Sequence, residues 1–291
     1  MTGMDHDTAS RFLLDDLDIT GTLVRIGPAW RQMLAGRDYP PAVAQLLGEM
    51  TATALLLGDK LKQPGRLTLQ LRGNGPLSLL VIDCNERLQL RGMARCQPLP
   101  PTATPDELLG DGQLLISLDL AAMRTPYQSI VPLEGGSIAE IFQHYLRQSE
   151  QQPARFLLTA SPTAVAGLLL QKMPDADRRD ADGWRRVEAL AATLTPAELL
   201  DLPATELLPR LFHQETVRLF PERPVDYHCP EDWAKVRAML RTLGRDEVYA
   251  ALQERGEILI RDDICNREYR FDALAVAELF ADDMPSSPTL H

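Results

Sequence analysis

The sequence predicts an α+β protein with a large N-terminal domain of antiparallel sheet and helices, a helical middle segment and a small C-terminal module. Two patterns indicate the first domain. Apolar residues spaced by three and four after Pro41 are typical of a helix, and apolar–polar alternation from Leu67 is typical of strands. The third observation is a change of composition after Pro174, where a charged stretch separates this domain from shorter elements.

Composition restricts the class of protein. Of the 291 residues, 45% are hydrophobic and 24% are charged, which supplies a core and excludes a wholly disordered chain. The formal net charge of −11 disfavours nucleic acid as a partner, because phosphates attract basic surfaces. No apolar run of about 18 residues predicts a membrane helix, and the polar first ten residues lack the apolar region of a signal peptide. We therefore expect a soluble, cytoplasmic protein with no membrane partner.

The first part of the chain, residues 10–65, is predicted to be mostly helical. Pro40 and Pro41 suit the first turn of a helix, and the apolar stripe that follows them indicates a largely buried one. The residues of this stripe are Val43, Leu46, Leu47, Met50, Ala54, Leu55 and Leu57.

A sheet is predicted from Leu67 onward. Apolar and polar residues alternate to Leu71, a Gly-Asn-Gly turn follows at residues 73–75, and the alternation resumes through Leu90. At least three antiparallel strands therefore form a meander. The four prolines of residues 97–105 predict a loop. Further strands are expected at residues 114–120, 127–133, 155–159 and 165–172, and a helix at residues 137–147.

Domain boundaries follow from these elements. Eight charged residues within 175–186 indicate an exposed boundary. In the middle segment, Thr195, Pro196 and Glu198 mark the start of a helix, and a second helix is expected at residues 206–213. The C-terminal module is expected to hold two helices, a hairpin and a last helix from Ala273. The predicted domains are residues 1–175 (N-terminal domain), 176–224 (middle segment), 225–280 (C-terminal module) and 281–291 (flexible tail).

The sequence lacks the usual motifs of enzymes. It contains no phosphate-binding Walker loop, no dinucleotide fingerprint opening a helix, no nucleophile elbow and no metalloprotease histidine pair. The five histidines are scattered, and His144 on a predicted helix is interpreted as a surface residue. We therefore expect no catalytic residues and no nucleotide cofactor.

The four cysteines form two pairs. Cys84 and Cys96 lie in or beside the meander and are interpreted as small apolar residues. Cys229 and Cys265 are 36 residues apart, each in a short polar stretch, which gives the C-terminal module a zinc-knuckle-like layout. Zinc normally takes cysteine or histidine at all four corners, so spacing alone leaves a metal site undecided.

Several segments, taken in order, identify a family resemblance that covers essentially the whole chain. They include LTLQLRGNGPL at residues 67–77, LRGMAR at 90–95, LLLQKMP at 168–174, LFHQE at 211–215 and CNREYRF at 265–271. Together they resemble the bacterial redox-regulated 33-kDa heat-shock chaperone (holdase) family. The resemblance implies an ATP-independent chaperone that binds unfolding proteins under heat or oxidative stress. It also implies a homodimer, at least in the active state, joined through the α+β domains.

The resemblance further implies a zinc site in the C-terminal module. Members of the family hold one zinc ion with four thiolates, from a Cys-x-Cys and a Cys-x-x-Cys pair. Oxidation joins neighbouring cysteines, releases the metal and unfolds the module together with the middle segment. On this chain the four positions are Cys229, Glu231, Asp262 and Cys265, so the chain is a member lacking two of the four zinc-site cysteines.

Two interpretations of these four positions remain open. Two thiolates and two carboxylates can ligate zinc, with His228 as a substitute ligand, although carboxylates should hold zinc less tightly than thiolates do. Alternatively, Glu231 and Asp262 solvate a metal-free module. The only disulfide available within the module joins Cys229 to Cys265, and closing this loop should stabilise the module by roughly 4 kcal/mol. Redox gating is therefore expected to be altered, because oxidation would not unfold the module.

Heat is an alternative trigger. About ten apolar side chains in some 55 residues make a marginal core, so heat could open the module. The expected core residues are Trp233, Val236, Leu240, Leu243, Tyr269, Phe271, Leu274 and Leu279. Apolar residues of the middle segment are candidates for client contact or for packing at rest: Trp184, Val187, Leu190, Leu207, Leu211 and Phe212.

The function predicted from the sequence is therefore a cytoplasmic, ATP-independent holdase gated by unfolding of its C-terminal module. Its partners are unfolded or aggregation-prone client proteins. The alternative is a metal-binding thiol oxidoreductase, which the absence of Cys-x-x-Cys and of a histidine cluster disfavours. A nucleic-acid-binding zinc ribbon is disfavoured by the acidic charge and the incomplete ligand set.

Overall fold

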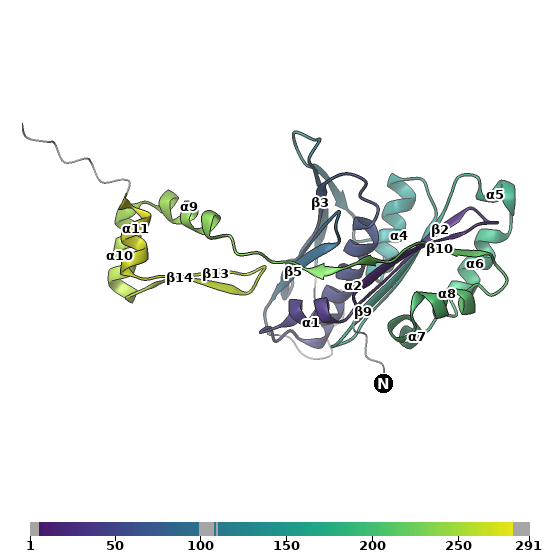
Figure 1. Ribbon diagram of the computed structural model, residues 1–291, viewed down its shortest axis with the longest axis horizontal. Helices are drawn as coiled ribbons and strands as arrows, with labels where there is room; N and C mark the ends of the chain where they lie inside the picture. The colour runs from purple at the N-terminus through teal and green to yellow at the C-terminus, as the bar shows by residue number, and fades with distance from the viewer. Residues whose placement is uncertain (1–5, 99–107, 109, 282–291) are drawn as a thin grey trace, which may run out of the picture. The chain divides into compact units, whose positions relative to one another are not determined.

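The computed structural model describes residues 6–98, 108 and 110–281 of the chain (Figure 1). It consists of two compact units, Met1–His228 and Cys229–His291, which we call the N-terminal unit and the C-terminal unit. The chain is thus α+β, as predicted. Most of the predicted loop at residues 97–105, and all but Ala281 of the predicted tail, lie outside the described residues.

The first sheet of the N-terminal unit has six strands in the order β10-β1-β2-β9-β8, with β11 pairing the beginning of β1. All of its strand pairs are antiparallel. The strands are β1 (Thr8–Leu14), β2 (Ile19–Ile26), β8 (Ala154–Ala160), β9 (Val165–Lys172), β10 (Val217–Leu219) and β11 (Arg223–Pro224).

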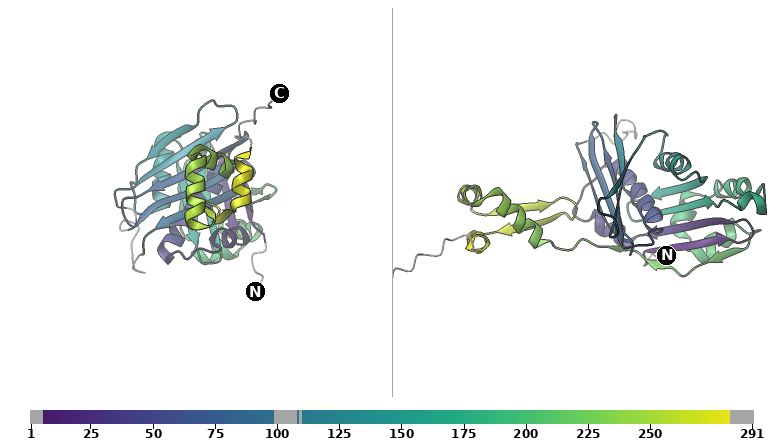
Figure 2. Two further views of the ribbon diagram at one scale, coloured as in Figure 1. Left: turned by 90° about the vertical axis from the view of Figure 1, so that its left-hand side faces the viewer. Right: turned by 90° about the horizontal axis from the view of Figure 1, so that it is seen from above.

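The second sheet contains the predicted meander and has the order β12-β5-β4-β3-β6-β7 (Figure 2, left). Leu67, Leu69 and Leu71 are buried and the polar residues between them are half-buried, as the alternation predicted. All pairs are antiparallel except β12 with β5, which is parallel. The strands are β3 (Gly65–Arg72), β4 (Leu77–Asn85), β5 (Gln89–Cys96), β6 (Gln113–Leu120), β7 (Tyr127–Val131) and β12 (Asp226–Tyr227).

Helix α2 (Pro41–Gly58) packs between the two sheets, with Pro40 as its N-cap residue. Twelve of its 18 residues are buried, so the prediction of a largely buried helix is confirmed. Helix α4 (Ile138–Ser149) packs against β8 and α2, and its N-cap Ser137 accepts a hydrogen bond from the backbone N–H of Glu140. The short helix α1 (Pro28–Leu34) precedes α2 and contacts β5 and β12.

The prediction of mostly helix for residues 10–65 is wrong at its beginning, where β1 and β2 form a hairpin. The reason is that both faces of the first sheet are covered. Val24 and Ile26 pack in the core beside α2, whereas Ile19 and Leu23 pack on the opposite side beside the middle-segment helices. A strand that is buried on both faces lacks the apolar–polar alternation that would have identified it.

The middle segment covers the outer face of the first sheet with four short helices (Figure 2, right). They are α5 (Ala176–Arg179), α6 (Gly183–Ala191), α7 (Pro196–Asp201) and α8 (Ala204–Leu211). The predicted start of α7 is confirmed as a capping box, in which Thr195 accepts from the Glu198 N–H and the Glu198 carboxylate accepts from the Thr195 N–H.

The C-terminal unit contains two helices, a hairpin and a last helix, as predicted. They are α9 (Trp233–Leu243), α10 (Arg245–Arg255), β13 (Ile258–Asp262), β14 (Arg267–Phe271) and α11 (Ala273–Leu279). Its core consists of ten buried apolar residues: Val236, Leu240, Val248, Leu252, Ile258, Tyr269, Phe271, Val276, Leu279 and Phe280.

Three residues predicted to lie in the core of this unit are exposed instead. Trp233 is 38% exposed, Leu243 is 52% exposed and Leu274 is 69% exposed. On α11 the buried face consists of Val276 and Leu279, spaced by three, and the C-cap residue Phe280 is buried beside them, so Leu274 lies on the outer side. None of the helices in the described ranges has the length and apolar character that crossing a membrane requires.

Candidate functional site

A disulfide joins the two cysteines of the C-terminal unit. Cys229 is the first residue of this unit and Cys265 lies in the turn between β13 and β14, and their Cα atoms are 5.7 Å apart. Both cysteines are half-buried. The bond therefore ties the beginning of the unit to the tip of its hairpin.

Asp262 organises the turn that carries Cys265. Its Oδ1 atom accepts hydrogen bonds from the backbone N–H groups of Ile264, at 2.9 Å, and Cys265, at 3.3 Å. Asn266 completes the turn with a φ of 50°, in the left-handed region that asparagine tolerates well. The carboxylate at this predicted metal position thus serves as an Asx-type cap of the hairpin turn.

Glu231 holds the indole ring of Trp233. Its Oε2 atom accepts from the indole Nε1–H at 2.8 Å, and its Oε1 atom faces the guanidinium of Arg267 at 3.6 Å. The indole is 38% exposed and packs edge-on against Tyr269, at 4.8 Å between centroids, and Phe271, at 5.7 Å. Glu231 therefore helps to fix an aromatic cover over one side of the small core.

These residues do not fit a zinc ion in this disulfide-bonded arrangement. Both sulfurs are joined to each other, and the two carboxylates are engaged with N–H donors. His228, the proposed substitute ligand, is exposed, and its backbone N–H donates to Leu90 O at 2.9 Å. Within the described ranges, no three His, Cys, Asp or Glu side chains gather as metal ligands would. A mixed thiolate–carboxylate site stays a prediction for the dithiol form.

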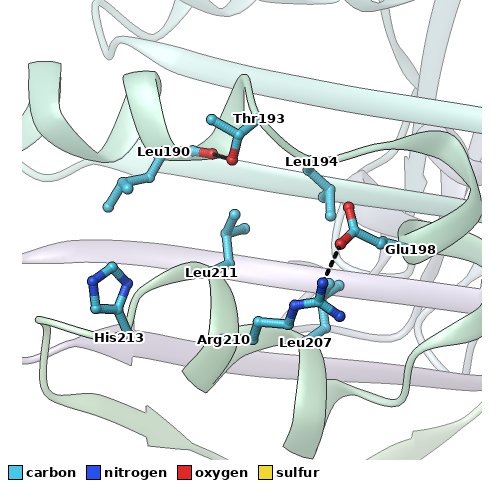
Figure 3. Close-up of a pocket in the computed structure, with 8 residues that line it drawn as sticks. All are labelled: Leu190, Thr193, Leu194, Glu198, Leu207, Arg210, Leu211 and His213. Atoms are coloured by element: carbon cyan, nitrogen blue, oxygen red, sulfur yellow. Dashed lines mark hydrogen bonds and ion pairs between the residues drawn. The ribbon is translucent and has the colours of Figure 1, made fainter.

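The apolar residues of the middle segment are packed at rest. Val187, Leu207, Leu211 and Phe212 are buried against the first sheet, and Trp184 is partly buried there. A pocket of about 270 Å³ lies beside them and is lined by residues of α6, α7 and α8. Figure 3 shows its lining side chains. Its walls include Leu190 and Leu194, and an ion pair between Glu198 and Arg210, 3.1 Å apart, lies at its side. Contact with clients through these residues thus requires this packing to open.

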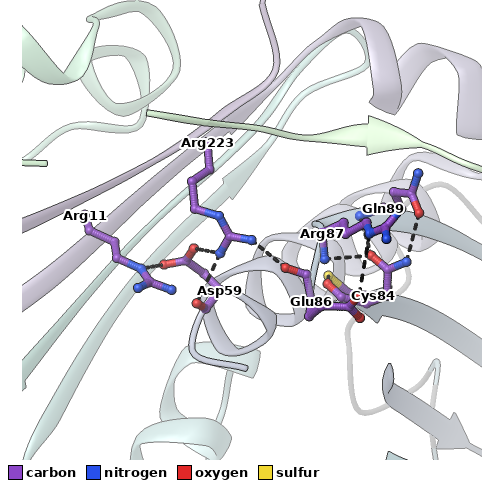
Figure 4. A network of polar contacts seen from close by, with 8 residues as sticks. Arg11, Asp59, Cys84, Glu86, Arg87, Gln89 and Arg223 are labelled. Atoms are coloured by element: carbon purple, nitrogen blue, oxygen red, sulfur yellow. Dashed lines mark hydrogen bonds and ion pairs between the residues drawn. The ribbon is translucent and has the colours of Figure 1, made fainter. Parts of the chain in front are cut away.

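A polar network anchors the linker segment, which we define as residues 217–228, to the N-terminal unit (Figure 4). The carboxylate of Asp59, at the end of α2, is fully buried and accepts from Arg223 Nη1 at 2.6 Å and from Arg11 Nε. Arg223 also donates to the backbone oxygen of Glu86 in the β4–β5 turn. Because β10 and β11 pair with β1 while β12 pairs with β5, the linker segment joins the edges of both sheets.

This network was not predicted from the sequence, since its hydrogen-bonded partners lie up to 164 positions apart. Two buried groups nearby have shifted pKa values. Burial lowers the pKa of Lys60 to about 8 and raises the pKa of Cys84 to about 12. The Cys84 thiol is therefore protonated and unreactive at neutral pH, which confirms its interpretation as a small apolar residue. Burial also raises the pKa of Cys96, which is half-buried, so the Cys229–Cys265 pair is the redox-active candidate among the cysteines.

Comparisons with known proteins agree with this architecture. The family model described as "Hsp33 protein" matches residues 7–272. The "33 kDa chaperonin" of Methylobacillus flagellatus is 41% identical over 289 residues, covering 98% of this chain and 99% of that protein. The "33 kDa chaperonin" of Pseudomonas aeruginosa is 41% identical over 287 residues, covering 96% of each chain.

A solved structure has the same fold. The crystal structure of the 33 kDa chaperonin (heat shock protein 33 homolog) from Thermotoga maritima superposes with a TM-score of 0.82 at 23% identity, over 96% of this chain and 99% of that one. The match extends over both units. Since the family match and the curated relatives span nearly the full length, and since this family consists of chaperones and not of enzymes, the chain belongs to the Hsp33 family of chaperones.

Proposed function

We propose that this chain is an ATP-independent holdase, active as a cytoplasmic homodimer, whose binding of unfolding clients is controlled by opening of the C-terminal unit. The observation that carries this proposal is the separate, small core of that unit, with ten buried apolar residues among those described. A surface that binds the unfolded client but not the native one lowers the concentration of aggregating chains by mass action, without fuel. The acidic net charge of −11 favours solubility of the loaded complex.

Opening of the C-terminal unit is the event that heat would promote. The apolar burial in a core of this size stabilises the folded state by little more than the conformational entropy that folding costs. Units this small therefore normally need a disulfide or a metal ion as well. Once the unit unfolds, its own apolar residues, such as Tyr269 and Phe271, become accessible. Further apolar surface comes from the middle segment if its helices then leave the first sheet.

The redox control that we propose differs in sign from that of a four-cysteine member of the family. The Cys229–Cys265 bond closes a loop of 36 residues, and such a crosslink should stabilise the folded unit by about 4 kcal/mol on the chain-entropy model. A dithiol reductant would transfer two electrons and two protons to this bond, forming two thiols and its own disulfide. Reduction then favours opening, and oxidation keeps the unit closed.

Suppression of aggregation tests this proposal. Light scattering of a thermally unfolding client, without nucleotide, is compared for the full chain in its disulfide and dithiol forms. We expect the dithiol form to suppress scattering at a lower temperature than the disulfide form. The Cys229→Ser/Cys265→Ser variant should behave like the dithiol form whether or not reductant is present. Stronger activity of the disulfide form would overturn the proposed sign, and inactivity of both forms would overturn the holdase.

A variant pair tests the gate without any redox change. Phe271→Ala removes a buried ring from the small core, whereas Leu274→Ala changes a residue of the same unit that is exposed. We expect Phe271→Ala to suppress aggregation at a lower temperature than the unaltered chain, because its C-terminal unit opens more easily. Leu274→Ala should leave the activation temperature unchanged, and equal effects of the two variants would contradict gating by this core.

A further inference from the structure

The edges of the two sheets in the N-terminal unit differ in how far other elements of the chain cover them. In the first sheet, β10 and β11 cover β1, and at the opposite edge the Phe156 N–H of β8 donates to Gln143 Oε1 of α4 at 2.9 Å. In the second sheet, the two-residue strand β12 lies along β5. The opposite edge is β7, a five-residue strand whose backbone pairs with β6 only, as far as the described residues show. Figure 2 (left) shows the teal strands β6 and β7 along one side of the second sheet.

Exposed apolar side chains of the N-terminal unit gather on β7 and just before it. Among the described residues of this unit, four large apolar side chains are exposed, and three of them lie within eight positions. These three are Met123, Tyr127, which is 51% exposed, and Ile130, which is 66% exposed. The strand carries no charged residue, and Pro126 and Pro132 flank it. Soluble proteins usually protect a free edge with charges or a covering element. Here only the shortness of the strand and the flanking prolines limit pairing.

We propose that β7 is a client-binding edge, at which an extended segment of an unfolded polypeptide adds to the second sheet as a seventh strand. This inference rests on the proposed holdase function. It assigns to β7 the first, weak contact with an extended client, and opening of the C-terminal unit then adds the apolar surface that holds the client. Strand addition is an established mode of peptide recognition, in which backbone hydrogen bonds supply affinity and alternate side chains meet the exposed face of the sheet.

The chemistry of a free edge selects an unfolded chain over a folded one. Backbone N–H and C=O groups of folded proteins are almost all paired, whereas those of an unfolded chain are available to a sheet edge. Because these groups are the same in every sequence, the edge does not depend on the identity of the client. This breadth matches what a holdase requires.

The side chains beside the edge add apolar contact. Ile130 is directly opposite Leu115 of β6, and Gln70 and Val81 continue the same cross-strand row. A client residue paired with Ile130 would extend this row by one position. The five residues of β7 between the two prolines span about 17 Å, so each bound segment is short and its affinity modest, which permits release.

A pair of synthetic peptides separates backbone pairing from simple adhesion. One is a fluorescent, soluble octapeptide rich in Val and Thr; the other has the same side chains but is N-methylated at alternate residues on one edge. Binding to the full chain is followed by fluorescence anisotropy. If strand addition holds the peptide, each lost hydrogen bond weakens binding, and we expect at least about tenfold weaker affinity after methylation. Equal affinity of the two peptides would overturn the proposal.

A second experiment locates the site on the molecule. Ile130→Lys introduces a charge of the kind that protects natural edges, and Leu274→Lys makes the same change at an exposed leucine of the C-terminal unit. We expect Ile130→Lys to weaken binding of the unmethylated peptide about fivefold or more, and Leu274→Lys to leave it unchanged. Circular dichroism checks that both variants are folded, and the peptide pair tests the proposal even if one is not.

Failure of this proposal is distinguishable from failure of the holdase. If Ile130→Lys suppresses client aggregation and binds peptide as the unaltered chain does, the edge is not the client site although the holdase stands. If Ile130→Lys instead abolishes self-association while peptide affinity is unchanged, the edge binds a second copy of the chain, and the proposal is wrong. If the unaltered chain suppresses no aggregation, the holdase itself fails.

Discussion

The two units of this chain are stabilised in different ways. In the N-terminal unit, α2 lies between two six-stranded sheets, and clusters of thirty-six and sixteen buried apolar residues join sheets and helices. In the C-terminal unit, ten buried residues and one disulfide hold two helices, a hairpin and a last helix. Since the smaller core has less apolar area to lose, local opening should begin there. In the proposed function, the N-terminal unit is the stable scaffold and the C-terminal unit is the part that opens.

The linker segment is part of the stable N-terminal unit. Val225 is buried in the main core, and the Arg223–Asp59 pair and the β11 and β12 pairings hold this segment to both sheets. A truncation that is meant to remove the C-terminal unit alone should therefore end after His228 rather than after Pro224. Ending at Pro224 would remove β12 and a buried valine from the scaffold.

The largest expected effect is that of the disulfide. Reduction of Cys229–Cys265 should lower the free energy of unfolding of the C-terminal unit by about 4 kcal/mol, since the open chain regains its loop entropy. The N-terminal unit contains no disulfide among its described residues, so its transition should not move. Differential scanning calorimetry with and without dithiothreitol resolves the two transitions. A shift of both transitions, or of neither, would contradict the claim that the disulfide stabilises the C-terminal unit alone.

The second largest effect on stability is expected from truncating a buried side chain of the C-terminal unit. Phe271→Ala should destabilise the C-terminal unit by about 3 kcal/mol, because the cavity left in so small a core cannot be filled by its neighbours. Leu274→Ala, on the exposed side of α11, should change stability by less than about 0.5 kcal/mol. Hydrogen exchange of the backbone amides in β13 and β14 measures both effects. Equal exchange rates in the two variants would contradict the observed burial.

The anchor of the linker segment can be tested by charge removal. Arg223→Ala leaves the buried Asp59 with Arg11 alone and should cost about 2 kcal/mol in the N-terminal unit. Arg218→Ala is the control, because its pair with Asp15 is largely exposed and should be worth below about 1 kcal/mol. Urea denaturation gives both values. If both substitutions cost the same, the buried pair does not anchor the linker segment.

Lys60 should make the stability of the N-terminal unit depend on pH. Burial lowers its pKa from 10.5 to about 8, so the folded state penalises the charged amine fully below about pH 8. Stability should therefore rise by about 1.4 kcal/mol per pH unit between about pH 8 and pH 10, where only the unfolded chain keeps the proton. Urea denaturation across this range measures the slope. Lys60→Met should abolish the pH dependence of stability, whereas Lys62→Met, at an exposed lysine, should leave it unchanged. If the slope in Lys60→Met is unchanged, the pH dependence comes from another group.

Much of the fold could be predicted from local pattern. The alternation in β3 to β5, the stripe of α2 and the capping box at Thr195 all use nearby residues whose spacing matches one period or one cap. The strands β1 and β2 could not be predicted, because helices cover both faces of their sheet and remove the alternation. In the C-terminal unit the elements were predicted, but three side chains assigned to its core, those of Trp233, Leu243 and Leu274, are exposed.

The sequence by itself determined the family, the elements of the C-terminal unit and the loss of two zinc-site cysteines, since each depends on residue identity at neighbouring positions. Only the tertiary structure decided what Glu231 and Asp262 bind, how Arg223 reaches Asp59 and that, among the described residues, the backbone of β7 pairs with β6 alone. These features join residues far apart in the chain. Long-range pairing is set by how whole sheets and helices pack, and a local pattern of side chains does not encode it.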